Sequence, residues 1–402
     1  MGMTDRQRKV AVFLACAAGL VVLPFVVQTF GNAWVRILDF ALLYILLALG
    51  LNIVVGYAGL LDLGYVAFYA VGAYLLALLA SPQLSDTFPA VAEIFESGLH
   101  APWWVVIPLG ALVAGVAGVL LGAPTLKLRG DYLAIVTLGF GEIVRVFMNN
   151  LDAPVNITNG PKGIGQIDDV SMFGFSFGQR HEFLGLEWPK VTNYYFLLLV
   201  LVVLAVVICF RLEKSRIGRA WMAIREDEIA AKAMGINTRN MKLLAFGMGA
   251  TFGGVSGVMF ASFQGFISPE SFTLQESVMI VAMVVLGGIG HLPGVIVGAL
   301  LLSALPEVLR YVAGPLQQWS GERLDAAILR QLLIALAMIG IMLARPRGLW
   351  PAPEHGRSLP APTPQPALAP APAEADPAVP QRVDLQSSAA TNPATGSGTR
   401  HS

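Results

Sequence analysis

The sequence predicts an all-α integral membrane protein with about eight transmembrane helices and one re-entrant hairpin of broken helices. Its composition is the first indication, because 55% of the 402 residues are hydrophobic and 13% are charged, whereas a soluble domain carries about 25% charge. Apolar runs long enough to cross a bilayer recur along the chain, and glycine-rich breaks interrupt them at two places. The formal net charge of zero excludes attraction of nucleic acid by bulk charge.

The first apolar run follows Arg6, Arg8 and Lys9, a pattern that secretory signal peptides share. The run is longer than a typical signal core and lacks a clear cleavage site, so we interpret it as a first span. Trp103 and Trp104 begin the fourth span, where an interfacial aromatic belt is expected. The eight predicted spans are residues 10–27, 37–56, 63–80, 103–123, 131–148, 194–210, 243–263 and 326–344.

Small residues recur every fourth position in two of the spans, a spacing that lets helices approach closely in lipid. They are Ala114, Gly118 and Gly122 in the fourth span and Gly249, Gly253 and Gly257 in the seventh. We expect both repeats to serve tight helix packing rather than a chemical role such as catalysis.

The chain leaves the helical pattern in residues 57–62 and again in residues 287–294. Non-helical backbone at membrane depth survives only where protein or a water-filled cavity covers it, because lipid offers no hydrogen-bond partners. The apolar stretch 278–305 around the second break is too long for one span, and we predict a re-entrant hairpin of two half-helices there. With a re-entrant hairpin at this position, both termini and most Lys and Arg lie in the cytoplasm, in agreement with the positive-inside rule.

Residues 1–350 are predicted to form one transmembrane domain, with a long outer loop at 149–193 and a charged cytoplasmic segment at 211–242. Residues 351–402 consist mainly of Pro, Ala, Ser and Thr with scattered charge. Such a composition cannot bury enough apolar surface to offset the entropy of ordering. We therefore expect a disordered tail.

The charged segment carries eight Lys or Arg and four acids between two apolar spans. Residues 221–234 contain few helix breakers, and Gly235 follows where a C-terminal cap would end a helix. This pattern is typical of a docking surface for a cytoplasmic partner. A solvated loop helix is the alternative.

The sequence lacks the motifs of catalysis and of nucleotide binding. No Gly-x4-Gly-Lys-Ser/Thr phosphate loop occurs, the five histidines are scattered, and Cys16 and Cys209 both fall in predicted spans. We therefore expect no catalytic residue, no metal and no cofactor bound by this chain, and we do not expect an enzyme.

Polar residues beside the two breaks are the candidates for lining a substrate path. Asn52, Tyr57 and Asp62 flank the first break and His291 lies in the second. Broken helices expose backbone groups that can bind the two ends of a zwitterion; the alternative is that the breaks only let the helices bend.

Two further charged residues, Glu142 and Arg145, lie three residues apart in the fifth span, so a structural ion pair is expected, with a substrate contact as the alternative.

Several runs together resemble the permeases of branched-chain amino-acid ATP-binding cassette (ABC) importers, and more narrowly the member of the heterodimeric pair with the longer outer loop. The charged segment contributes GRAWMAIREDEIAAKAMGIN from residue 218. The other runs are LGLNIVVGYAG from residue 49, LRGDYLAIVTLGFGEIVR from 128, TNGPKGI from 158 and VLGGIG from 285. The resemblance covers most of residues 37–350.

The resemblance implies the ABC importer permease architecture in a bacterial inner membrane, with transport by alternating access. It also implies a second permease subunit, two ATPase subunits that use the ATP, and a periplasmic substrate-binding protein. The coupling residues it implies are Arg225, Glu226, Glu228, Ala230, Ala231 and Gly235. The Glu-Ala-Ala-x3-Gly motif of such importers matches at Ala230, Ala231 and Gly235, but Ile229 stands where the acid is expected.

Other functions stay open at this point. Importer permeases for urea or short amides are similar in fold and motifs, and a self-contained small-solute channel or secondary transporter would also have broken helices. A membrane enzyme would use Glu142, Asp62 and His291 as acid–base groups, although these residues lie at no recognisable catalytic spacing.

Overall fold

The computed structural model describes residues 18–95, 98–126, 128, 130–172, 175–183, 186–319, 326–345 and 348–350. These residues belong to one compact unit, Met1–Ala352. The predicted tail at 351–402 and the beginning of the first predicted span at 10–17 lie outside the described residues.

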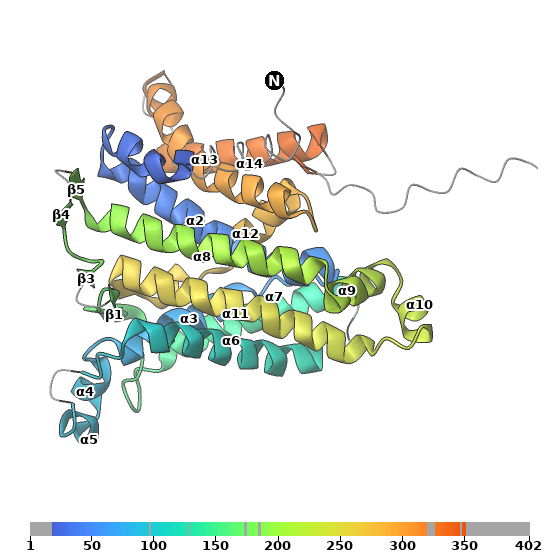
Figure 1. The fold of residues 1–402 in the computed structure, drawn as a ribbon, viewed down its shortest axis with the longest axis horizontal. Coiled ribbons are helices and arrows are strands. Elements are labelled where there is room, and N and C mark those ends of the chain that lie inside the picture. The colour runs from blue at the N-terminus through green and yellow to red at the C-terminus, as the bar shows by residue number, and fades with distance from the viewer. Residues whose placement is uncertain are drawn as a thin grey trace, which may run out of the picture. The chain divides into compact units, whose positions relative to one another are not determined.

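The described chain is almost entirely helical (Figure 1). The apolar helix Ala18–Gln28 comes first. The long helices are α2 (Asn32–Asn52), continued by the π-helical turn η1 (Ile53–Tyr57), α3 (Val66–Leu79), α6 (Trp103–Thr125), α7 (Asp131–Asn150), α8 (Lys190–Glu213), α11 (Thr238–Gln264), α12 (Leu274–Gly287), α13 (Leu292–Trp319) and α14 (Ala326–Ala344). The short ones are α4 (Gln83–Thr87), α5 (Pro89–Ala92), η2 (Gly160–Lys162), α9 (Arg216–Glu226), α10 (Glu228–Ala233) and η3 (Pro269–Ser271).

Six helices of the described chain are long and apolar enough to cross a membrane. They are Asn32–Tyr57, Trp103–Thr125, Lys190–Glu213, Thr238–Gln264, Pro269–Gly287 and Leu292–Arg310, and three shorter apolar helices accompany them. The prediction of a helical membrane protein is thus confirmed at this level. The predicted fifth span is helical as α7 but is not among the six, since its charged residues and asparagines lower its hydropathy.

The predicted hairpin of two half-helices is not confirmed, and for its second arm it is wrong. The first arm, α12, has 14 residues, but α13 has 28 and continues through Pro306 and Glu307. The apolar run ends at Leu305, whereas the backbone hydrogen bonds of a helix do not require apolar side chains. Hydropathy alone therefore underestimated the length of this helix.

The small-residue repeats pack as predicted. Helix α11 contacts α6, α3 and α2, and Figure 1 shows α11 running alongside α6. A Cβ atom on Gly118 of α6 would lie 2.5 Å from the Cβ of Ala250, and one on Gly257 of α11 would lie 2.1 Å from the carbonyl oxygen of Tyr69. Only glycine permits these two approaches, so the repeats set the distances between α11 and its neighbours.

The long loop between α7 and α8 is held by three two-stranded antiparallel ribbons. Strand β1 pairs with β6 directly after α11, β2 pairs with β3, and β4 pairs with β5. Their bounds are β1 Ile164–Gly165, β2 Ser171–Met172, β3 Phe175–Ser176, β4 His181–Phe183, β5 Leu186–Trp188 and β6 Phe266–Ile267. The pairing of β1 with β6 fixes the loop to the end of α11.

Candidate functional site

The two helix breaks, far apart in the sequence, meet in the structure. Asn52, at the last position of α2, is buried, and its side-chain oxygen Oδ1 accepts a hydrogen bond of 2.9 Å from the backbone N–H of Gly290. Near the start of α12, Ser277 donates its hydroxyl to the carbonyl oxygen of Leu63, which follows the first break. The end of α2 and the start of α13 are therefore joined at one point, here called the junction: Asn52, Gly56, Gly59 and Gly290.

Arg225 of α9 reaches this junction. Its Nη1 donates to the carbonyl oxygen of Gly56, close to the end of η1, where carbonyls lack helical partners and attract a cation. A Cβ atom on Gly290 would lie 2.7 Å from the same Nη1, and one on Gly59 would lie 2.8 Å from Cγ of Arg225. Both glycines have left-handed backbone, with φ of +82° and +70°. The charged segment thus touches both breaks through one side chain.

The charged segment is two helices rather than the single predicted helix over 221–234. Helix α9 ends at Glu226, and Asp227 then takes an extended conformation and caps α10 by accepting from the N–H groups of Ile229 and Ala230. Aspartate favours such a cap over a helix interior because its side chain competes for backbone donors. Gly235, with φ of +85°, follows the end of α10 at the predicted position.

One face of α9 anchors the segment to the helices of the membrane domain. Trp221 and Ile224 are buried on this face, and the indole Nε1 of Trp221 donates a 2.7 Å hydrogen bond to the carbonyl oxygen of Met241 in α11. In α10, Ala231 is buried, and Glu228 forms a 2.7 Å ion pair with the buried Lys242.

The outer face of α10 is exposed and partly apolar. Ile229 is 74% exposed and Met234 is 83% exposed. Glu226, Ala230 and Lys232 are also exposed. Two large apolar side chains are thus exposed beside charged ones on the charged segment.

The residues predicted to line the substrate path differ in burial and in the segments that they contact. Tyr57 and Asp62 are buried beside the first break, and Asp62 accepts a 2.9 Å hydrogen bond from the N–H of Gly64. His291 instead contacts the chain after α14, with its Nδ1 3.0 Å from the carbonyl oxygen of Trp350.

The segment after α14 closes over the second break. The backbone N–H groups of Leu349 and Trp350 donate to the carbonyl oxygens of Leu286 and Gly287, at 2.7 and 3.1 Å. These carbonyls end α12 and have no helical partner of their own. Residues 348–350, here called the strap, therefore cap α12 from outside.

The expected ion pair between Glu142 and Arg145 forms in α7. Nε of Arg145 lies 3.1 Å from both carboxylate oxygens of Glu142, and its Nη1 lies 3.4 Å from Glu270 of η3. The guanidinium of Arg145 thus pairs with the carboxylates of Glu142 and Glu270 and links α7 to η3.

Sequence reasoning missed two acids inside the membrane domain. Asp39 of α2 is fully buried, and both its carboxylate oxygens lack a hydrogen-bond partner among the described residues. Glu276 of α12 accepts a 2.9 Å hydrogen bond from the hydroxyl of Tyr44. An ionisable residue within an apolar run is costly and was a signal available for Asp39.

Comparison with known proteins gives a family for most of the chain. Residues 33–342 match the model described as "Branched-chain amino acid transport system / permease component". The chain is similar to the high-affinity branched-chain amino acid transport system permease protein LivM of Escherichia coli (strain K12), with 41% identity over 362 residues, 87% of this chain and 76% of LivM. It is also similar to LivH, a permease protein of the same description from that strain, with 27% identity over 263 residues, 64% of this chain and 79% of LivH.

A more distant similarity is to the probable LivM of Methanocaldococcus jannaschii, at 26% identity over 330 residues, 77% of this chain and 90% of that protein. No solved structure matches the chain.

Proposed function

This chain belongs to the family of branched-chain amino acid transport permeases, and we propose that it works as one of two permease subunits of an ABC importer in a bacterial inner membrane. It is a multi-pass membrane protein that moves branched-chain amino acids. Both LivM and LivH of one strain are similar to it, and both are named permease proteins of a high-affinity branched-chain amino acid transport system. A second, related permease is therefore its partner, and permeases for urea or amides are not favoured.

The observation that best supports the proposal is that α9 and α10 combine exposed apolar side chains with a hydrogen bond to the junction. Ile229 and Met234 are highly exposed, while the guanidinium of Arg225, a residue that is itself exposed, reaches the carbonyl oxygen of Gly56 at the junction. We assign the outward side to an ATPase subunit, with a second ATPase on the partner permease. ATP is bound and hydrolysed there, and this chain binds no nucleotide.

The same geometry suggests how ATP drives alternating access. A docked partner that binds differently in its two states can shift α9, and Arg225 would carry that shift to both helix breaks. A change at the junction alters how α2 and α13 meet. The path for the amino acid would open to one side at a time.

The same contacts support a proposed orientation. Gly290 lies beside Arg225 and the neighbouring His291 contacts Trp350, so the end of α14 and the charged segment share one side of the membrane. We place this side, and both termini, in the cytoplasm, where most Lys and Arg then fall. The long loop faces the periplasm, where a substrate-binding protein delivers the amino acid.

The test combines purification with transport. The membrane-extracted wild-type chain should bring a second permease and ATPase subunits with it, and the complex in liposomes, with the binding protein, should take up leucine only with ATP. Exchange of Ile229 and Met234 for Asp should remove the ATPase subunits while leaving the second permease bound, because the change affects only the exposed face. Arg180→Ala in the long loop, far along the chain from α10, is the control for retention and should leave both the ATPase subunits and the second permease bound. A chain that purifies alone and passes neutral solutes without ATP would instead be a channel.

A further inference from the structure

A cavity of about 380 Å³ lies on the side of the long loop, away from the junction. It is formed by the end of α3, the start of α6, the end of α11 and loop residues 168–171 and 176. Its volume falls in the range of about 300–1,000 Å³ that small-molecule sites occupy. None of the residues that form the junction lines this cavity.

Part of the cavity wall is aliphatic. Leu76 of α3, Val170 of the loop and Val258 of α11 line it and are themselves buried in the protein core. Ile107 of α6 adds a further branched side chain. This wall suits a branched aliphatic group of the ligand.

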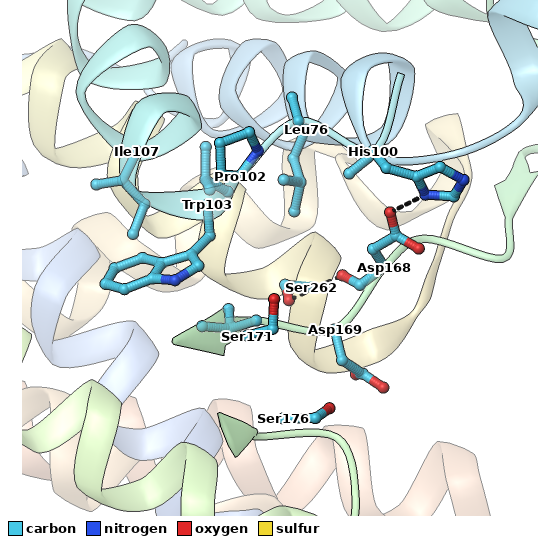
Figure 2. Close-up of a pocket in the computed structure, with 14 residues that line it drawn as sticks. Leu76, His100, Pro102, Trp103, Ile107, Asp168, Asp169, Ser171, Ser176 and Ser262 are labelled. Atoms are coloured by element: carbon cyan, nitrogen blue, oxygen red, sulfur yellow. Dashed lines mark hydrogen bonds and ion pairs between the residues drawn. The ribbon is translucent and has the colours of Figure 1, made fainter. Parts of the chain in front are cut away.

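The opposite wall carries carboxylates. Asp168 lies 2.5 Å from Nδ1 of His100, and Asp169 lies 2.6 Å from Nζ of Lys190. Each carboxylate has two oxygens that accept hydrogen bonds, and each of these two contacts involves one of them. Figure 2 shows the His100–Asp168 pair on the far side of the cavity from Trp103, with Ser171 and Ser262 between them.

A hydrogen-bond donor stands across from the carboxylates. The indole Nε1 of Trp103 is buried and has no hydrogen-bond partner among the described residues. Trp103 is the first residue of α6, where the helix presents free N–H groups and a partial positive charge. The hydroxyl of Ser171 lines the same cavity. An unpaired buried donor of this kind is costly unless a ligand accepts from it.

We propose that this cavity receives a zwitterionic amino acid with a branched aliphatic side chain. The ammonium group binds Asp168, the carboxylate accepts from Nε1 of Trp103 and from Ser171, and the side chain packs against Leu76, Val170 and Val258. The inference rests on the proposed function and deepens it, because it names the site where this permease takes up the amino acid that the binding protein delivers.

The first test measures binding directly, on the assembled transporter. In a background where Cys16 and Cys209 are replaced by Ser, Ser171→Cys should react with a thiol reagent, and L-leucine should slow the reaction several-fold. N-acetyl-leucine, which lacks the ammonium, and leucinamide, which lacks the carboxylate, should not protect. Gln179→Cys, exposed in the same loop but outside the cavity, is the control and should react equally with and without leucine.

The second test uses matched substitutions. Trp103→Phe removes the N–H donor together with part of the indole ring and should lower leucine uptake at least about two- to tenfold at saturating loaded binding protein, the effect of one lost hydrogen bond. Trp104→Phe, at the exposed neighbouring residue, should leave uptake unchanged. Asp168→Asn should lower uptake more than His100→Gln, whereas a merely structural pair would make the two equal.

The outcomes separate the inference from the proposed function. If the wild-type complex takes up leucine with ATP, but leucine does not protect Ser171→Cys and Trp103→Phe transports normally, the cavity is not the site. If the wild-type complex itself fails to take up branched-chain amino acids, the proposed function fails. Equal protection of Gln179→Cys would also overturn the site, because the effect would then not be local.

Discussion

Arg225 shows how much of one residue's role a sequence can predict. The family resemblance implied a coupling role for it, but its hydrogen bond to Gly56, 169 positions earlier, could not be inferred from neighbouring residues. Asn52 is a similar case, since it was predicted beside a substrate path and its amide oxygen holds Gly290, 238 positions away. Local pattern identifies the residue type, whereas the contact depends on how distant helices pack.

Substitution of Arg225 should separate docking from coupling. Arg225→Ala removes a charge-assisted hydrogen bond worth about 1.5–3 kcal/mol, so we expect ATPase subunits to co-purify while leucine uptake falls. Arg225→Lys keeps the charge but not the planar guanidinium and should retain part of the uptake. Wild-type uptake by Arg225→Ala would show that the contact with Gly56 carries no coupling.

Gly290→Ala should destabilise the protein. The new Cβ would lie 2.7 Å from Nη1 of Arg225, and the positive φ costs a non-glycine residue about 1–2 kcal/mol. The measurement is the melting temperature of the purified complex. Gly139→Ala in α7, where a Cβ meets nothing within 4 Å, is the matched control and should be neutral or stabilising.

The elements were predicted best where hydropathy and helix length agree. Spans such as α6 and α11 match their expected ranges within a few residues, and the small-residue repeats lie at helix contacts. The errors came where a polar residue had two possible roles. Asp227 could continue a charged helix or begin a new one. Its side chain accepts hydrogen bonds from the first turn of α10, so a new helix begins there. Glu307 marks the end of an apolar run but not the end of α13.

The cap at Asp227 provides a test of α10 as an element. Asp227→Ala should remove two hydrogen bonds to the first turn and cost about 1 kcal/mol. We expect faster hydrogen exchange at residues 229–233 and weaker retention of ATPase subunits. Asp227→Ser restores a capping oxygen and should recover most of both. If exchange in α10 is unchanged in Asp227→Ala, the cap does not hold this helix.

At the scale of the whole molecule, three segments far apart in sequence converge on the second break. Asn52 comes from α2, Arg225 from α9 and the strap from beyond α14. Composition and span pattern were sufficient to predict the membrane class, and the resemblance of several sequence runs indicated the transport family. They could not predict this convergence, because each contact joins segments that lie far apart in the chain and that no local sequence pattern relates.

Truncation tests the strap. A chain ending after Arg345 loses the hydrogen bonds from Leu349 and Trp350 to the end of α12, so its melting temperature and leucine uptake should both fall. A chain ending after Ala352 keeps the whole compact unit and should behave as the full-length protein does. Equal behaviour of the two truncated chains would mean that the strap adds nothing to the break.

The strap also sets an order for biogenesis. Leu349 and Trp350 donate to the carbonyl oxygens of Leu286 and Gly287 at the end of α12. These hydrogen bonds can form only after α13 and α14, which lie between the two segments in the sequence, have been synthesised. During insertion, the break between α12 and α13 must therefore stay hydrated or be held by other chains. Helix α14 and the strap that follows it have to be in place before the break that Arg225 touches can reach its finished form.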